Sequence, residues 1–277
     1  MTLTRKDVLE LLHRHDLRPS RALGQNFVVD PNTVRRIARL AGVGPGDRVL
    51  EVGAGLGSLT LALAETGAEV VAVERDRQLL PLLRRLVEPK GVRVVRGDAL
   101  DLDWHALLGC SGGWVMVSNL PYNVAVPLVM ELLEKAEGIS RMLVMVQREV
   151  AARLAAEAGE EAYGAVSVKV AYRARASVVG RVPSTVFVPR PRVESALVAI
   201  ERRGEPAVSV DEERLFTLVN AGFAHRRKML RRALAGLVEE EVLVAAGVKP
   251  EARAEELDIE AWGRLARCAT HNEPSPS

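Results

Sequence analysis

The sequence predicts an α/β fold in which a doubly wound, mostly parallel sheet is followed by a small all-helical domain. Between residues 48 and 146, short apolar runs alternate with segments of helical periodicity, a pattern typical of strands joined by crossover helices. From Asp211 onward only helical periodicity appears. The length of 277 residues accommodates one large domain and a small one.

Five continuous apolar runs are the predicted strands of the parallel sheet. They cover residues 48–52, 69–73, 92–95, 114–117 and 142–146. Strands that are buried on both faces are apolar throughout rather than alternating, and parallel sheets are buried in this way. The segments between the runs are long enough for crossover helices, so we expect consecutive strands to be parallel.

The pattern changes after the fifth run. A helix is predicted over about 147–158, followed by strands at 166–170 and 196–200 that complete the sheet. The connection between these two strands contains Pro183, Pro189 and Pro191. Proline cannot donate a hydrogen bond to a neighbouring strand, so its confinement to the connection agrees with this assignment.

The domain boundary is predicted near Gly204, where a Gly-Glu-Pro sequence precedes the helical segment. We expect a first domain over 1–203, a helical domain over 204–271 and a tail over 272–277. The tail is rich in proline and serine, which predicts that it is frayed.

The charges of the chain are unevenly distributed, although the formal net charge is only +2. Residues 165–203 hold eight Lys or Arg against two Glu, and residues 214–238 hold six Lys or Arg and no acid. A solvated charged face usually mixes both signs, so this segregation predicts a surface that binds a polyanion such as nucleic acid.

Several classes of protein are disfavoured by the composition. The sequence has no run of about 18 apolar residues, and residues 1–7 contain no apolar stretch of the signal-peptide type. We therefore expect a soluble, cytoplasmic protein without a membrane partner. The two cysteines, Cys110 and Cys268, are too few and too far apart to predict a disulfide framework or a metal cluster, so no metal is expected.

A glycine-rich turn follows the first predicted strand. Gly53, Gly55 and Gly57 come directly after Glu51 and Val52, and a helical pattern begins at the next residue. Glycines let the backbone turn sharply and let a ligand approach the main chain closely. The Gly-x-Gly-x-Gly spacing departs from the dinucleotide fingerprint Gly-x-Gly-x-x-Gly, but dinucleotide and methyl-donor enzymes both use turns of this kind.

Carboxylates end the next two predicted strands, at Glu74 and Asp98. Glu74 can accept both hydroxyls of a ribose, and Asp98 can accept the exocyclic amine of an adenine. The structural alternatives are a solvated strand end for Glu74 and a helix N-cap ahead of Leu100 for Asp98. Two acids beside the glycine turn disfavour a pyrophosphate and favour a cationic cofactor. S-adenosylmethionine, which carries a positively charged sulfonium, fits this description.

The tetrapeptide Asn119-Leu120-Pro121-Tyr122 closes the fourth predicted strand. Asn119 can accept a hydrogen bond from an adenine N6 amine, while a nearby main-chain carbonyl accepts the other, which makes the nitrogen more nucleophilic. Pro121 lacks an N–H and keeps Leu120 extended, and Tyr122 offers a stacking face for an unstacked base. The structural alternative is a Pro-Tyr turn in which Asn119 caps the following helix.

Six stretches in the same order carry a resemblance to a known family, at residues 23–27, 51–57, 119–123, 145–150, 186–195 and 223–230. The chain resembles the KsgA/RsmA family of small-subunit ribosomal RNA adenine dimethyltransferases, which is related to the Erm methyltransferases and mitochondrial transcription factor B. The resemblance implies a Rossmann-like class I methyltransferase fold and S-adenosyl-L-methionine as cofactor, with S-adenosyl-L-homocysteine as product.

The activity that the resemblance implies is N6,N6-dimethylation of two adjacent adenosines in the 3′-terminal hairpin loop of 16S rRNA. The expected partner is that RNA within a small-subunit assembly particle, and the expected enzyme is a monomer. Two alternatives remain open: an Erm-like enzyme that acts on 23S rRNA, and a non-catalytic RNA-binding assembly factor with the same fold.

The resemblance also implies roles for residues that the patterns alone do not single out. It implies that Asn26 and Val28 contact the cofactor, together with Gly53, Gly55, Glu74, Asp98 and Asn119. It implies that Phe187 joins Tyr122 around the target base, although Phe187 would otherwise be interpreted as a core residue. The basic residues expected to contact RNA phosphates are Arg190, Arg192, Arg226, Arg227, Lys228 and Arg231.

Overall fold

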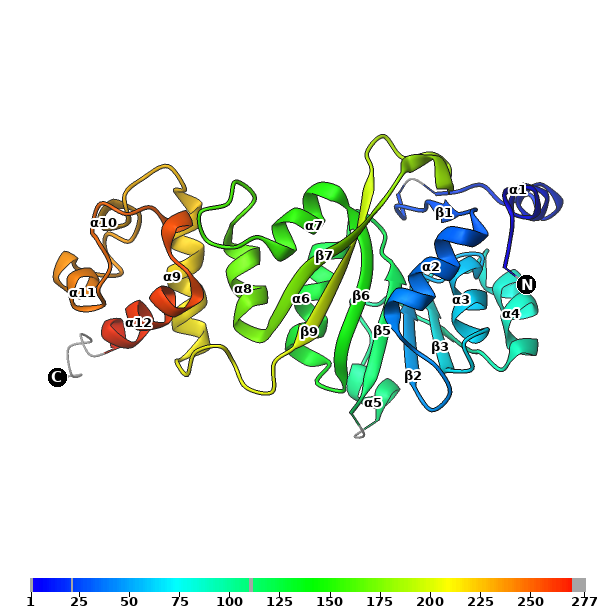
Figure 1. Ribbon diagram of the computed structural model, residues 1–277, viewed down its shortest axis with the longest axis horizontal. Coiled ribbons are helices and arrows are strands. Elements are labelled where there is room, and N and C mark those ends of the chain that lie inside the picture. Colours follow the sequence, from blue (N-terminus) through cyan, green and yellow to red (C-terminus); the bar gives the residue numbers. More distant parts are fainter. Residues whose placement is uncertain (1, 21, 110–111, 271–277) are drawn as a thin grey trace. The chain divides into compact units, whose positions relative to one another are not determined.

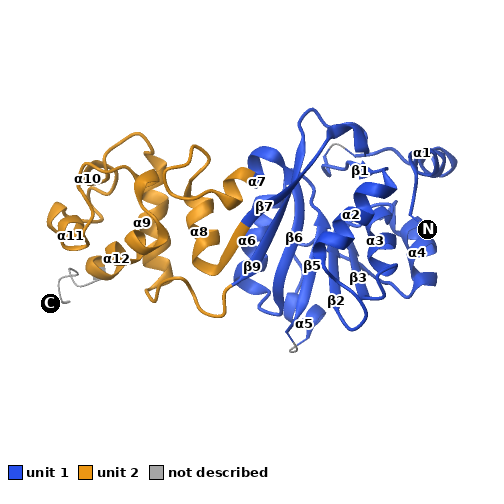
Figure 2. Ribbon diagram, viewed as in Figure 1, with its two compact units in different colours: residues 1–151, 177–202 blue, residues 152–176, 203–277 orange. Residues whose placement is uncertain are grey.

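The computed structural model describes residues 2–20, 22–109 and 112–270, and the chain divides into two compact units (Figure 2). The first unit comprises residues 1–151 and 177–202, and the second comprises 152–176 and 203–277. One passage between the units, at 202/203, lies next to the predicted boundary, but residues 152–176, which were predicted to lie in the first domain, belong to the second unit.

A mixed sheet of seven strands, counted over the described residues, forms the centre of the first unit (Figure 1). Its order is β4-β3-β2-β5-β6-β9-β7. The strands are β2 (Arg48–Val52), β3 (Glu69–Glu74), β4 (Arg93–Arg96), β5 (Trp114–Asn119), β6 (Ile139–Gln147), β7 (Ala174–Val182) and β9 (Ser195–Arg202). The strands β2 to β6 are parallel to their neighbours, and β9 runs antiparallel to β6. The prediction of a mostly parallel sheet is therefore confirmed.

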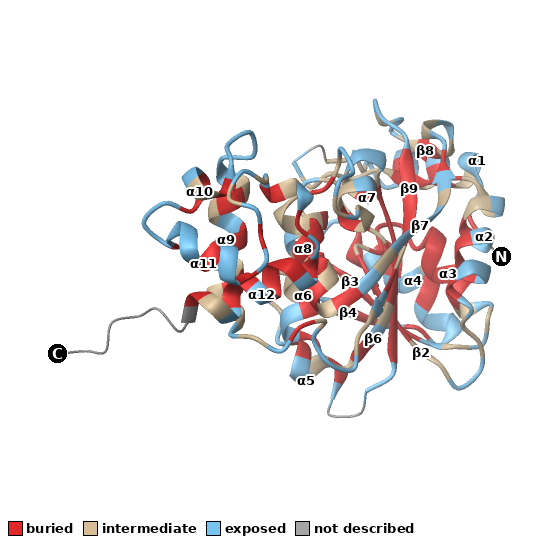
Figure 3. Cartoon of the chain, turned by 60° about the vertical axis from the view of Figure 1, so that its left-hand side comes forward, coloured by how far each residue is buried: buried red, intermediate tan, exposed pale blue. Residues whose placement is uncertain are grey.

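The five apolar runs correspond to β2 to β6, and the run at 196–200 lies in β9. Four of the five residues of β2 and five of the six in β3 are buried, as expected for central parallel strands (Figure 3). From β2, the chain adds β3 and β4 on one side and then β5 and β6 on the other, so the order of the strands changes direction between β2 and β5. In parallel sheets a crevice forms at the carboxyl ends of the two strands where this change occurs.

The helices of the first unit include α1 (Arg5–Arg14), α2 (Pro31–Ala41), α3 (Ser58–Ala64), α4 (Leu80–Val87), α5 (Trp104–Leu108) and α6 (Ala125–Lys135), with the short 3-10 helices η1 (Glu88–Lys90) and η2 (Ser184–Val186). Of these, α2, α3, α4 and α6 contact strands of the central sheet. The bounds of α2 follow from its sequence: Asp30 accepts the Thr33 N–H at 2.9 Å, Pro31 opens the helix, and Gly42 ends it in the left-handed conformation.

A second, two-stranded sheet joins β1 (Phe27–Val28) to β8 (Phe187–Val188), and the sequence did not predict it. Phe27 pairs with Val188 and Val28 pairs with Phe187 in antiparallel register. Strands of two residues are too short to show any periodicity, so no pattern could indicate them. This pairing attaches the segment before α2 to the proline-rich connection before β9.

The predicted strand at 166–170 is wrong, because these residues lie in α8 (Ala165–Arg173). Val168 and Tyr172, one helical turn apart, are buried in the core of the second unit. The helix begins where the Ser167 hydroxyl accepts the Gly164 N–H at 3.1 Å and donates to the Arg153 carbonyl at 2.6 Å. An apolar alternation of only five residues does not distinguish a strand from a buried helix.

The second unit is otherwise helical, as predicted. Its further helices are α9 (Glu212–Ala224), α10 (Leu230–Ala233), α11 (Glu240–Ala245), η3 (Ala254–Glu256) and α12 (Ile259–Thr270). The helix α7 (Arg148–Ala155) lies where a helix was expected over 147–158, and the boundary between the units falls within it. Trp262 is fully buried at the centre of its core and packs near Phe223, with ring centroids 6.1 Å apart.

Some expectations fall on residues that the structure does not describe, namely the tail at 272–277 and Cys110. Along the described ranges, the helices are too short or too polar for any of them to span a membrane.

The Arg202 guanidinium joins the end of β9 to the carboxyl end of α6. It donates to the carbonyl oxygens of Leu132 at 2.8 Å, Leu133 at 2.7 Å and Ala136 at 3.1 Å, and also to that of Ile139 at 2.8 Å. The last carbonyl groups of a helix have no partner within the helix, and a cation near them is favourable.

We expect Arg202→Met to lower the free energy of unfolding by about 2–4 kcal/mol, because half-buried carbonyl groups lose a charged donor. Chemical denaturation of the two proteins measures the difference. Arg93→Met is the matched control, since Arg93 is exposed on β4. Equal losses in the two variants would contradict this role for Arg202.

Candidate active site

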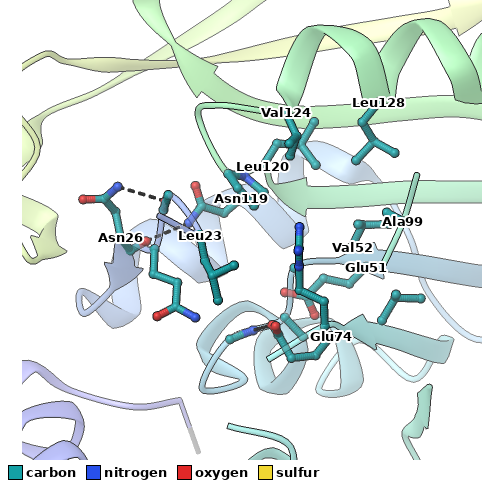
Figure 4. A pocket seen from close by; sticks show the side chains of 18 of the residues that line it. Leu23, Asn26, Glu51, Val52, Glu74, Ala99, Asn119, Leu120, Val124 and Leu128 are labelled. Carbon is teal, nitrogen blue, oxygen red and sulfur yellow. Dashed lines mark hydrogen bonds between the residues drawn. The ribbon is translucent and has the colours of Figure 1, made fainter. Parts of the chain in front are cut away.

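A cleft opens at the carboxyl edge of the parallel strands (Figure 4). Its walls come from the segment before β1, the turn after β2, the ends of β3 and β4, and the loop after β5. The predicted residues among its lining are Asn26, Val28, Gly53, Gly55, Glu74, Asp98, Asn119, Leu120, Pro121 and Tyr122. The structure thus brings together every predicted cofactor and catalytic residue except Phe187.

The glycine turn after β2 adopts a backbone that other residues rarely take. Gly53 and Gly55 have φ angles of +75° and +58°. A Cβ on Gly55 would lie 3.0 Å from the Phe27 ring, and one on Gly53 would lie 3.3 Å from Pro121. The positive φ angles therefore favour glycine, the limited space adds to this preference, and the bare main chain of the turn lines the cleft.

Glu74 is a buried carboxylate at the end of β3, and the alternative of a solvated strand end is wrong. Its Oε2 accepts the Gly55 N–H at 2.7 Å, and its Oε1 accepts the Asp76 N–H at 2.8 Å. Burial raises the pKa of Glu74, while these two hydrogen bonds oppose the shift. Each oxygen keeps a further lone pair for a ligand hydroxyl.

Glu51 is a second buried carboxyl in the cleft wall, and the sequence analysis did not propose it as a site residue. It is 2% exposed, and its Oε2 has no hydrogen-bond partner among the described residues. Burial raises the pKa of Glu51 from 4.5 to about 8; the Thr60 hydroxyl opposes this shift and the charge of Glu74 adds to it. Its place just before the glycine turn was the signal that could have indicated it.

Asp98 is not a helix N-cap, because the next helix, α5, begins at Trp104 and is capped by Asp103. The Asp98 Oδ1 accepts the Leu100 N–H at 3.2 Å within a turn. Its Oδ2 lies 2.9 Å from the Arg75 guanidinium, and the residue also lines the cleft. The Asp98 side chain is 28% exposed, so it remains accessible to a ligand.

Asn119 presents an unsatisfied acceptor in the cleft wall. Its Nδ2 donates to the Asn26 carbonyl at 3.0 Å, and Asn26 in turn donates to the Gly24 carbonyl at 3.2 Å (Figure 4). The Asn119 Oδ1 is buried and bonds to nothing in the described part of the chain. Asn119 does not cap the next helix, because Val124 holds that position. A buried carbonyl without a donor is costly, so this one indicates a ligand that donates.

The loop after β5 is fixed by main-chain contacts. Leu120 is buried and its N–H donates to the Met145 carbonyl of β6 at 3.0 Å, while Val124 N–H donates to the Pro121 carbonyl at 3.2 Å. Tyr122 is half-buried beside the cleft, and this burial raises the pKa of its phenol. The Tyr122 ring is therefore accessible for stacking while its hydroxyl stays protonated at neutral pH.

Phe187 is fully buried in the core of the first unit and does not line the cleft. It pairs with Val28 across the two-stranded sheet, so it lies behind the cleft wall that Val28 forms. This placement agrees with the pattern-based interpretation of Phe187 as a core residue. Its contact with a target base stays a prediction.

Two of the predicted RNA-binding arginines lie in the connection before β9. Arg190 and Arg192 are both exposed, and Arg190 donates to the Ser184 hydroxyl at 3.0 Å. In the second unit, Arg226 Nε donates to Glu255 at 2.6 Å, and Arg231 lies within 4.0 Å of two other glutamates.

Arg227 and Lys228 differ from these neighbours. Both are exposed between α9 and α10, and neither side chain has a hydrogen bond or ion pair to any residue that the structure describes; the Lys228 main-chain N–H donates to the His225 carbonyl at 2.7 Å. They can therefore bind an anion without breaking a contact within the protein.

A metal centre is not indicated. Within the described ranges, no three His, Cys, Asp or Glu side chains gather so that they could hold a metal ion.

Comparison with known protein families gives a match over nearly the whole chain. The model of a family described as ribosomal RNA adenine dimethylase matches residues 17–271. A protein of Kineococcus radiotolerans, named ribosomal RNA small subunit methyltransferase A, is 48% identical over 95% of this chain and 90% of its own length. A protein of the same name from Nocardia farcinica is 49% identical over 94% of this chain and 93% of its own.

Solved structures with similar folds include two transferases. The 23S rRNA methyltransferase ErmE superposes with a TM-score of 0.70 at 26% identity, covering 88% of this chain and 99% of its own. A dimethyladenosine transferase from Plasmodium falciparum gives a TM-score of 0.73 at 22% identity, covering 85% of this chain and 94% of its own. These likenesses confirm the predicted Rossmann-like fold.

We expect Glu51→Gln to stabilise the ligand-free protein at pH 8 and to change it little at pH 5. The pKa of Glu51 is about 8 in the folded protein, against an ordinary value of 4.5. Between pH 4.5 and pH 8 the folded protein therefore keeps a proton that the unfolded chain releases, so the stability of the wild type falls as the pH rises through this range. The free energy of unfolding falls by about 1.4 kcal/mol per pH unit in this range, and the glutamine of the variant does not titrate, so the variant does not show this fall.

Denaturant unfolding at the two pH values measures this difference between wild type and Glu51→Gln. Glu69→Gln is the matched control, because Glu69 is exposed at the start of β3. An effect of Glu51→Gln that is the same at pH 5 and pH 8 would contradict the raised pKa.

Proposed function

The chain belongs to the ribosomal RNA adenine dimethylase family, and from this membership we propose that it dimethylates N6 of adenosines in small-subunit ribosomal RNA. The enzyme is an S-adenosylmethionine-dependent rRNA adenine dimethyltransferase. Within this chain, the buried and unpartnered Oδ1 of Asn119 in the cleft wall is the observation that best supports this activity. An acceptor in that position suits the amine of an adenine.

The cleft fits S-adenosylmethionine, whose sulfonium provides an electrophilic methyl group. Gly53 and Gly55 bring bare main chain to the cleft, so a ligand can approach closely. Glu74 is placed to accept ribose hydroxyls, and Asp98 to accept an adenine amine. Glu51 adds a third carboxyl to the same wall, and its raised pKa of about 8 keeps it mostly neutral at pH 7. A cleft with several carboxyl groups, and with no basic side chain among the described residues in contact with Glu74, favours a cationic ligand over a pyrophosphate.

Asn119 orients the target amine and does not act as a base. Its Oδ1 accepts one N6 hydrogen, and a main-chain carbonyl beside Leu120 accepts the other, so the nitrogen lone pair becomes available for attack. The alkylated nitrogen is acidic and sheds its proton to water. Tyr122 stacks on the base once the base has left its own helix. The rate then depends on positioning, since no covalent intermediate with the protein is needed.

The basic side chains position the RNA. Arg190 and Arg192 in the first unit, and Arg227 and Lys228 in the second, are exposed and suited to phosphate contacts. We propose as the specific substrate two adjacent adenosines of the 3′-terminal hairpin loop of 16S rRNA, presented in a small-subunit assembly particle. We further propose that the enzyme works as a monomer in the cytoplasm.

The relatives favour the small subunit over the alternative of a 23S rRNA substrate. Proteins named ribosomal RNA small subunit methyltransferase A are 48% and 49% identical to this chain, whereas ErmE is 26% identical. A non-catalytic assembly factor is disfavoured because the cleft keeps the acids, the glycine turn and the unpartnered amide that methyl transfer requires.

Mapping of methylated adenosines tests the proposed substrate. Purified protein is incubated with S-adenosylmethionine and small ribosomal subunits that lack the modification, and with large-subunit RNA as the control. We expect dimethylation at two adjacent adenosines of the small-subunit hairpin. Methylation of large-subunit RNA alone would support the Erm-like alternative, and RNA binding without methyl transfer would support the assembly factor.

Asn119→Ala is expected to lower kcat by roughly 10²–10³-fold, because it removes the acceptor that activates the amine. Binding of S-adenosylhomocysteine and the thermal unfolding temperature show whether the cleft stays folded. Asn32→Ala is the matched control, since Asn32 is exposed on α2 and does not line the cleft. Methyl transfer at the wild-type rate by Asn119→Ala would rule out the proposed role.

A further inference from the structure

The phenol of Tyr122 is held by a residue outside the cleft. Its hydroxyl lies 2.7 Å from the Oγ of Ser195, within hydrogen-bond distance. Ser195 is completely buried and does not line the cleft, so it has no direct access to a ligand there. Whatever Ser195 contributes to a bound base therefore passes through the Tyr122 ring.

Ser195 occupies a fixed point of the central sheet. It is the first residue of β9, and its register partner is Gln147 at the end of β6. The preceding residue, Glu194, accepts the Arg148 N–H through its carbonyl at 3.0 Å, and the two side chains approach to 3.8 Å. Pairing with β6 thus fixes the main chain at Ser195, and complete burial of its side chain leaves the hydroxyl little room to move.

Tyr122 needs such an anchor because it lies on a loop. The main chain of this loop is attached to β6 through Leu120, but the Tyr122 side chain still has two rotatable bonds. A hydrogen bond at the far end of the ring removes that freedom and leaves the ring held at both ends. A ring that is already oriented loses less entropy when a base stacks on it.

We infer that Ser195 is a positioning residue that holds the Tyr122 ring in the orientation in which it stacks on the target adenine. This inference rests on the proposed function, in which Tyr122 stacks on the base. A merely structural hydroxyl pair would affect folding stability and leave catalysis unchanged. A positioning pair must affect turnover of RNA while leaving the binding of cofactor product unchanged.

A double-mutant cycle separates these two possibilities. Ser195→Ala, Tyr122→Phe and the double variant are assayed for kcat/KM on small ribosomal subunits that lack the modification. We expect each single variant to lose roughly three- to tenfold, and the double variant to lose no more than either single one, because both changes break the same hydrogen bond. The Kd for S-adenosylhomocysteine should be unchanged in all three.

Ser167→Ala provides the matched control, as Ser167 is another buried serine whose hydroxyl donates to a main-chain carbonyl, in the second unit. It is expected to lower stability without lowering kcat/KM, and to show no coupling to Tyr122→Phe. Additive losses for Ser195→Ala and Tyr122→Phe, or a stability loss in Ser195→Ala with kcat/KM unchanged, would overturn the inference.

Tyr122→Ala distinguishes failure of this inference from failure of the proposed function. Full activity in that variant would remove the stacking role itself, and with it the premise for Ser195. Loss of activity in Tyr122→Ala, together with an unaffected Ser195→Ala, would leave the proposed function standing and overturn only the role of Ser195.

Discussion

The buried carboxylate of Glu74 is the contact on which the cleft depends. One of its oxygens accepts the Gly55 N–H from the turn after β2, and the other accepts the Asp76 N–H just beyond its own strand. It thereby fixes two loops that leave adjacent strands at the same sheet edge. Parallel pairing of β2 and β3 brings those loops together, and the carboxylate sets their spacing. The same group faces the cleft, so one side chain serves both the fold and the ligand.

The strand pattern predicted most of the sheet and the side chains at its carboxyl edge. Glu74, Asp98 and Asn119 could be located because each lies at the end of a continuous apolar run or within three residues of it, and such ends meet at one edge. The strand expected at 166–170 was wrong, since burial of Val168 and Tyr172 in a helical core outweighed a short alternation. The β1–β8 pair joins segments far apart in the chain, and no local pattern encodes such a contact.

The parts of the site that escaped prediction are those that only tertiary contacts create. The raised pKa of Glu51 comes from burial and from the neighbouring Glu74, neither of which a spacing reveals. The hydrogen bond from Asn119 Nδ2 to the Asn26 carbonyl fixes the orientation of the amide, and in this orientation the Oδ1 meets no donor among the described residues. Buried acids and an unsatisfied amide lower the stability of the ligand-free protein, a common property of preorganised functional sites.

The assignment of residues 152–176 to the helical unit has a consequence for how this unit can be inherited. The chain passes from one unit to the other at residues 151/152, 176/177 and 202/203, so the helical unit is encoded by two separate segments. A single recombination event after residue 202 would transfer α9 to α12 without α8, whose Val168 and Tyr172 complete their core. The helical unit therefore cannot be exchanged intact as one contiguous segment of the gene.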